Sequence, residues 1–182
     1  MINRAITFAT VSHANQTRKG TNIPYILHCL EAGVIAASLA TKEGQINTDV
    51  VCAAILHDTM EDAYVSYATL KEVFNKTIAD LVQSQSEDKT KSWRERKQAT
   101  IDFLQANTNK SVEIATLADK LSNMRAIASD YEKQGEALWD RFNADKASQH
   151  WYYSAIATSL TQLSETKPYQ EYCALVEQTF QM

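Results

Sequence analysis

An all-α fold is predicted by three features of the sequence. Apolar residues recur at intervals of three and four in several blocks, which is the period of an amphipathic helix. Only four Gly and two Pro occur in 182 residues, so residues that interrupt helices are scarce. A chain of this length that is 45% hydrophobic can build one core and is short for two. We therefore expect a single domain over residues 1–182, formed as a bundle of about eight to ten helices.

The apolar pattern predicts the helices in order along the chain. They span residues 2–17, 24–40, 48–59, 67–74, 76–86, 91–106, 111–128 and 143–165, and a further helix lies near the C-terminus. Pro24 suits the first turn of the second helix, where its missing N–H costs no hydrogen bond, and this places His28 one turn further in. The polar stretch QSQSEDKTKSWRERK is interpreted as a charged loop that opens a surface helix.

Charge and cysteine usage exclude several classes of protein. A net charge of −4 argues against nucleic-acid binding as the main task. No stretch approaches the roughly 18 apolar residues of a membrane span, and the first residues lack the apolar core of a secretion signal. Cys29, Cys52 and Cys173 are widely spaced and odd in number, which favours free thiols. We expect a cytoplasmic protein that has neither a nucleic acid nor a membrane as its partner.

The stretch CAAILHDTMED, residues 52–62, is the first candidate for chemistry. An apolar run reaches His57 and Asp58, and two more acids, Glu61 and Asp62, follow within the next helical turn. Residues three and four apart share a helix face, so these acids lie close to Asp58. Adjacent helical residues diverge by about 100°, so His57 and Asp58 reach one ion only if the chain turns between them.

Two further residues complete a candidate metal site. His28 lies on the second predicted helix, and Asp119 interrupts the apolar segment TLADKLSNMRAI. Two imidazoles and two carboxylates suit Mn²⁺, Fe²⁺, Co²⁺ or Zn²⁺, with positions open to water, as in a catalytic site. Each residue also has an ordinary interpretation. Asp119 could pair with Lys120 or Arg125, and Glu61 and Asp62 could be a solvated helix end.

Four stretches together resemble one known family. They are HANQTRKGTNIPYILH at 13–28, AAILHDTMED at 53–62, SEDKT at 86–90 and LADKLSNMRAI at 117–127. In order and spacing they resemble the HD-domain phosphohydrolases, and within them the alarmone hydrolases related to the hydrolase domain of Rel/Spo-type proteins. The chain departs from the family pattern at Cys29, where proline is common, and at Ala63, where threonine is usual.

The resemblance implies a fold, a reaction and a set of roles. The fold would be a helical HD domain, and the reaction would remove the 3′-pyrophosphate from ppGpp or pppGpp to give GDP or GTP. One Mn²⁺ would be bound by His28, His57, Asp58 and Asp119. Glu61 and Asp62 would activate and orient the attacking water, with Glu61 favoured as the base. The purine would contact Arg18 and Lys19, and the ribose or a phosphate would contact Asn123.

Further phosphate contacts are predicted from two basic segments. Lys89, beside SEDKT, and Lys146, in RFNADK, are the candidates, whereas Trp151, Tyr152 and Tyr153 are predicted to be core and rim residues. The site occupies about the first 150 residues, so we expect no synthesising domain in this chain. Two other functions stay open: another mononuclear HD nucleotidase or dNTP phosphohydrolase, and a nucleotide sensor without turnover. The preference for guanine or adenine and the activity toward NADPH also stay open.

Overall fold

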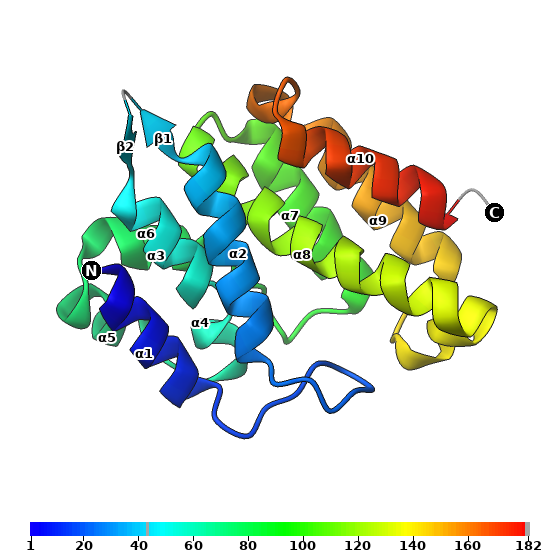
Figure 1. The fold of residues 1–182 in the computed structure, drawn as a ribbon, viewed down its shortest axis with the longest axis horizontal. Helices are drawn as coiled ribbons and strands as arrows, with labels where there is room; N and C mark the ends of the chain where they lie inside the picture. The colour runs from blue at the N-terminus through cyan, green and yellow to red at the C-terminus, as the bar shows by residue number, and fades with distance from the viewer. Residues whose placement is uncertain (43, 181–182) are drawn as a thin grey trace.

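The computed structural model describes residues 1–42 and 44–180, and most of these residues are helical (Figure 1). The first half contains α1 (Ile2–Ser12), α2 (Ile26–Leu39), the antiparallel strands β1 (Thr41–Lys42) and β2 (Gln45–Ile46), α3 (Thr48–Leu56), α4 (Thr59–Asp62), α5 (Tyr67–Val73) and α6 (Lys76–Gln83). The second half contains α7 (Trp93–Ala106), α8 (Lys110–Gln134), the 3₁₀ helix η1 (Gly135–Arg141), α9 (Lys146–Ser159), the 3₁₀ helix η2 (Thr161–Leu163) and α10 (Lys167–Phe180). The predicted all-α class is confirmed.

Three helices form the centre of the fold. Helix α2 packs against both α3 and α8, α1 and α6 cover α3, and α10 packs against α8 and α9 (Figure 1). Every residue from Val50 to Leu56 in α3 is buried, as expected for a helix that is covered on several sides. A single hydrophobic cluster reaches from Ala5 to Phe180. The three central helices also position the candidate ligands, since His28 lies on α2, Asp119 lies on α8 and His57 directly follows α3.

Side-chain caps define where several of these helices begin. The Asn47 side chain accepts hydrogen bonds from the backbone N–H groups of Asp49 and Val50 at the start of α3. Ser92 and Glu95 form a reciprocal capping box at the start of α7. Such caps satisfy N–H groups that have no partner within the helix. The start of α7 confirms the prediction of a charged loop that opens a helix.

Several predicted boundaries are wrong, and backbone geometry explains the first two. Helix α1 ends at Ser12 instead of residue 17, because the chain turns after it and Asn15 adopts a left-handed φ of 66°. Helix α2 begins at Ile26, so Pro24 precedes it and instead forms an isolated β-bridge with Thr17. The loop between α1 and α2 therefore spans the segment that contains Arg18 and Lys19.

Other differences lie further along the chain. The predicted helix 48–59 ends at Leu56, and α4 continues after a two-residue turn. Helix α8 extends to Gln134 and is followed by η1, which the apolar pattern did not predict, and the predicted helix 143–165 divides into α9 and η2. Among the described residues, no helix combines the length and apolarity that crossing a bilayer requires.

Candidate active site

The turn between α3 and α4 brings two adjacent side chains to one point. His57 and Asp58 are the two residues between the helices, and the Thr59 hydroxyl donates to the Leu56 carbonyl across the turn at 2.7 Å. Because the helix is interrupted here, His57 Nε2 lies 2.8 Å from Asp58 Oδ2. The chain therefore turns between His57 and Asp58, which is the condition for both side chains to reach one ion.

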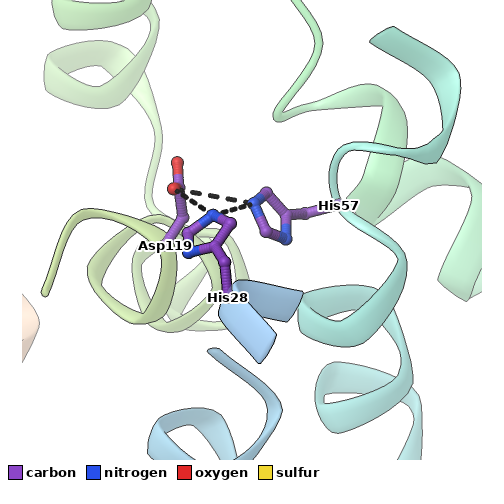
Figure 2. A group of neighbouring side chains, drawn as sticks. All are labelled: His28, His57 and Asp119. Carbon is purple, nitrogen blue, oxygen red and sulfur yellow. Dashed lines mark hydrogen bonds and ion pairs between the residues drawn. The ribbon is translucent and has the colours of Figure 1, made fainter. Parts of the chain in front are cut away.

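Side chains from α2 and α8 meet this turn. Figure 2 shows His28, His57 and Asp119 pointing toward one another from three different segments. His28 Nε2 lies 3.1 Å from His57 Nε2, 3.3 Å from Asp119 Oδ1 and 3.5 Å from Asp58 Oδ2. His57 Nε2 lies 3.5 Å from Asp119 Oδ1. His28, His57 and Asp119 are buried and close enough together to hold one metal ion, and Asp58 lies beside them.

Hydrogen bonds to the outer nitrogens orient both imidazoles. His57 Nδ1 lies 2.7 Å from the Ala54 carbonyl oxygen, which can only accept, so Nδ1 carries a proton and Nε2 is the nitrogen that faces the cluster. His28 Nδ1 lies 2.8 Å from Ser122 Oγ. The two Nε2 atoms and the carboxylate oxygens then face one another, an arrangement that is repulsive unless positive charge, from a proton or a metal ion, lies among them. This donor set fits a divalent metal ion.

The charges in the cluster favour positive charge at its centre. Burial opposes protonation of His57, but Asp58 and Asp119 raise the pKa of its imidazole well above the usual value. Burial opposes ionisation of Asp119, yet Lys120 and His57 hold the pKa of that carboxyl well below its usual range. Burial opposes ionisation of Asp58 as well, but His57 and His28 keep its pKa well below the usual value. Both carboxylates are therefore ionised at neutral pH, as metal ligands must be.

The two acids on α4 have different environments, because Glu61 is less exposed than Asp62. Glu61 has a side chain that is 18% exposed and accepts a hydrogen bond from the Glu87 backbone N–H at 3.3 Å. Burial and the negative charges of Glu87 and Asp58 raise the pKa of Glu61. Asp62 is 38% exposed, and its carboxylate accepts from Lys89 Nζ at 2.8 Å. Glu61 thus has the environment that suits a proton acceptor near neutral pH.

A cavity of about 600 Å³ adjoins His28, a volume within the usual range of a nucleotide-sized ligand site. Tyr25, Tyr152 and Tyr153 form part of its wall. Basic side chains predominate among its charged lining residues, and Glu31 and Asp130 are the acidic members. The basic members are Arg18, Lys19, Lys97, Lys120, Arg125, Lys133 and Arg141. A local basic patch therefore lies beside the candidate metal ligands, although the net charge of the chain is negative.

Three of the predicted substrate contacts lie at this cavity. Arg18 Nη2 donates to Asn123 Oδ1 at 3.0 Å, and Asn123 Nδ2 donates to Asp119 Oδ1 at 2.5 Å. Lys19 also lines the cavity, and its Nζ donates to Asn143 at 3.0 Å. Asn123 thus contacts the candidate metal cluster directly, and Arg18 is connected to the cluster through Asn123.

The other two predicted contacts lie elsewhere. Lys89 Nζ donates to the Glu61 carbonyl and the Asp62 carboxylate, each at 2.8 Å, so it contacts the acidic pair and does not line the cavity. Lys146 Nζ donates to Glu136 at 2.7 Å and to Tyr131 at 3.2 Å, and it is also outside the cavity lining. The structure therefore does not bring Lys146 to the candidate site.

Lys120 and Tyr152 are among the residues of the cavity wall that were not predicted as site residues. Lys120 Nζ lies 2.6 Å from Asp119 Oδ2 and 5.6 Å from the centroid of the Tyr152 ring. The Tyr152 hydroxyl is buried and has no hydrogen-bond partner among the described residues, although its ring borders the cavity. The only sequence signal for Lys120 was its position next to Asp119, and Tyr152 resembled an ordinary core aromatic.

Comparisons with known proteins agree with this geometry. A family model described as HD domain matches residues 5–145. The guanosine-3′,5′-bis(diphosphate) 3′-pyrophosphohydrolase MESH1 of Danio rerio is 35% identical over 124 residues, which cover 67% of this chain and 66% of that protein. A crystal structure from Listeria monocytogenes EGD-e has a TM-score of 0.76 and 30% identity, over 85% of this chain and 99% of the other.

A further structure shows the same fold at lower sequence identity. It is described as a metazoan ortholog of SpoT that hydrolyses ppGpp, and it has a TM-score of 0.80 at 20% identity. The match covers 97% of this chain and 94% of that chain, so it includes α9 and α10, which lie beyond residue 145.

Proposed function

Because the chain belongs to the HD domain family, we propose that it is a divalent-metal-dependent hydrolase that removes the 3′-pyrophosphate from ppGpp or pppGpp. The products are GDP or GTP and pyrophosphate. The observation that carries this proposal is the convergence of His28, His57, Asp58 and Asp119 beside a basic cavity. The activity named for the zebrafish relative supports the choice of substrate.

We propose Mn²⁺ as the metal, bound by the two Nε2 atoms and the two aspartates. When bound, such a cation neutralises phosphate charge and makes water a stronger acid. The mixed nitrogen and oxygen donor set supports this choice, since imidazole and carboxylate together suit metals of this class. The hydrogen bonds to Ala54 and Ser122 support it further by directing the free lone pairs inward.

Glu61 acts as the general base in this proposal. Its raised pKa and its proximity to Asp58 support the role, because a carboxylate with a pKa nearer neutrality accepts a proton more effectively. The water oxygen forms a bond to the phosphorus attached to the 3′-oxygen as Glu61 takes a proton from the water, and the bond from that phosphorus to the 3′-oxygen breaks. The 3′-oxygen takes up a proton and ends as a hydroxyl, which balances the proton that Glu61 later releases. Asp62 orients the water, and Lys89 restrains Asp62 through their 2.8 Å contact.

The cavity wall binds the nucleotide. Arg18 stacks on the purine with help from Lys19, because a guanidinium is planar and stays charged. Asn123 contacts the ribose or a phosphate. Lys97 and Lys120 supply positive charge for phosphate groups at the wall nearest Asp119, and both line the cavity. Lys146 has no part in this scheme, because it lies outside the lining.

We also propose that residues 1–182 act as one domain, since a single hydrophobic cluster reaches from Ala5 to Phe180. Three unpaired cysteines, two of them buried, support the cytoplasm as the place of action. The partner is a small purine nucleotide.

A turnover panel tests the function. The protein is incubated with Mn²⁺ and, separately, ppGpp, pppGpp, ppApp, NADPH and dNTPs, and the products are identified by mass. The proposal predicts pyrophosphate and GDP from ppGpp. Turnover of dNTPs without ppGpp hydrolysis would identify another HD nucleotidase. Binding of ppGpp without turnover of any nucleotide would identify a sensor.

A further inference from the structure

We propose that Ser122 and Glu31 form a hydrogen-bond relay that sets the tautomer of His28 and thereby makes its Nε2 available to a metal ion. The inference rests on the proposed metal site and adds two positioning residues to it. Neither residue touches the reacting atoms, so their effect is exerted through His28.

The relay joins two helices through residues one turn apart. His28 and Glu31 share a face of α2, and Asp119 and Ser122 share a face of α8, because residues separated by three positions are neighbours on a helix. Since α2 packs against α8, the two pairs meet. His28 Nδ1 lies 2.8 Å from Ser122 Oγ, and Ser122 Oγ lies 2.7 Å from Glu31 Oε2.

The chemistry of the groups allows only one direction for the protons. A carboxylate only accepts, so the single hydroxyl proton of Ser122 is donated to Glu31. The Ser122 oxygen must then accept, and His28 donates its Nδ1–H to it. In the neutral imidazole, His28 Nε2 is then the nitrogen without a proton, and it points into the cluster. His28 and Ser122 are 3% and 1% exposed, so water does not offer an alternative partner.

At the outer end of the relay, Arg125 fixes the direction of the hydrogen bond to Glu31. Arg125 Nη1 donates to Glu31 Oε1 at 2.9 Å, and the opposite side of the guanidinium donates to both carboxylate oxygens of Glu171 on α10. A guanidinium has only donors. A side chain that replaces Glu31 therefore keeps the contact with Arg125 only if it presents an acceptor.

His57 shows why this dependence is particular to His28. The Nδ1–H of His57 is held by the backbone carbonyl of Ala54, and a backbone acceptor is present whatever the side chain. His28 has only side chains for the same purpose. The tautomer of His28 is therefore the one that a substitution away from the metal can reverse.

Glu31→Gln tests the relay without changing its shape. In this variant the contact with Arg125 is kept when the amide oxygen faces the guanidinium, and the amide NH₂ then faces Ser122 and donates to it. The Ser122 proton then turns to His28 Nδ1, and the imidazole proton moves to Nε2. The expected results are reversal of the His28 tautomer in metal-free protein, read from imidazole ¹⁵N chemical shifts, and a Mn²⁺ Kd that rises about 10–100-fold.

Two more variants complete the test. Ser122→Ala removes the acceptor and should also weaken Mn²⁺ binding, with folding checked by circular dichroism. Glu171→Gln is the matched control, because Glu171 contacts Arg125 only on its outer side, and it should leave both the tautomer and the Kd unchanged. The parental tautomer together with a Kd within twofold of the parent in Glu31→Gln would overturn the relay. These readouts need no turnover, so absence of ppGpp hydrolysis would overturn the proposed function and leave the relay testable.

Discussion

The metal cluster and the cavity wall are adjacent but are built in different ways. In the cluster, side chains from α2, α8 and the turn after α3 lie within 3.5 Å of one another, and His28 and His57 are each 3% exposed or less. The wall is drawn from the loop after α1 and from several helices, and its basic residues are largely paired with other side chains. The cluster is thus preformed, whereas the wall must exchange protein contacts for substrate contacts.

This difference predicts graded effects of substitution. Removing a member of the cluster should abolish metal binding and turnover, because buried ligands have no replacements nearby. Removing a residue of the wall should weaken binding by a limited amount, because several basic groups share the same task. The four substitutions below follow this order, from the largest effect to the smallest.

Asp119→Asn should have the largest effect. An amide keeps the size of the side chain and leaves Lys120 with a partner, but it lacks the negative charge that a divalent metal requires. Metal content after dialysis should fall, and ppGpp turnover should fall by about 10³-fold or more if the metal supplies several kcal/mol. Both are measured on protein whose helicity matches the parent. Retention of one metal per chain would remove Asp119 from the ligand set.

Glu61→Gln should separate chemistry from binding. The variant keeps the hydrogen bond from the Glu87 backbone but cannot accept a proton. The expected result is a fall in kcat of about 10²–10⁴-fold with metal content and KM near the parental values. Steady-state kinetics provide the measurement. An unchanged kcat with a raised KM would instead make Glu61 a binding residue.

Arg18→Ala should weaken substrate binding and leave the metal in place. Loss of a desolvated cation–π contact costs about 1–2 kcal/mol, or roughly 5–30-fold in the Kd for ppGpp. Lys146→Ala is the matched control at a basic residue outside the cavity lining, and its Kd should stay within about twofold of the parent. Equal Kd values for both variants would contradict the assignment of the wall.

Tyr152→Phe should have the smallest effect on binding and a distinctive effect on stability. The buried hydroxyl lacks a partner among the described residues, so its removal should not lower the melting temperature. If the hydroxyl donates to substrate, KM should rise by about 2–10-fold, the scale of one hydrogen bond. A lowered melting temperature with an unchanged KM would assign Tyr152 to the core alone.

The same contrast explains what could be predicted from the sequence. His28, His57, Asp58 and Asp119 were recognisable because each polar residue interrupts an apolar helical pattern, and such interruptions are local signals. Lys120 and the Ser122–Glu31 pair depend on which helix faces meet, and that depends on tertiary packing. Basic residues in loops and on helix surfaces look alike in sequence, so Lys146 could not be told apart from Arg18 by charge alone.

The helices were likewise easier to predict from the sequence than the residues at which they end. Helix α3 was predicted because every residue from Val50 to Leu56 is apolar, but its end at Leu56 depends on the turn that serves the site. The end of α1 at Ser12 depends on the left-handed residue Asn15, for which the apolar pattern gives no signal. Apolar patterns therefore predicted most of the α-helices, and local backbone geometry decided where they end.

Hydrolysis of ppGpp in H₂¹⁸O, with metal-stripped protein before and after addition of Mn²⁺, tests the central claim most directly. The account predicts no turnover before addition. After addition, mass spectrometry should find one ¹⁸O atom in pyrophosphate and none in GDP, because water attacks the phosphorus that leaves with the pyrophosphate. Turnover that does not depend on added metal, or release of products other than GDP and pyrophosphate, would contradict it.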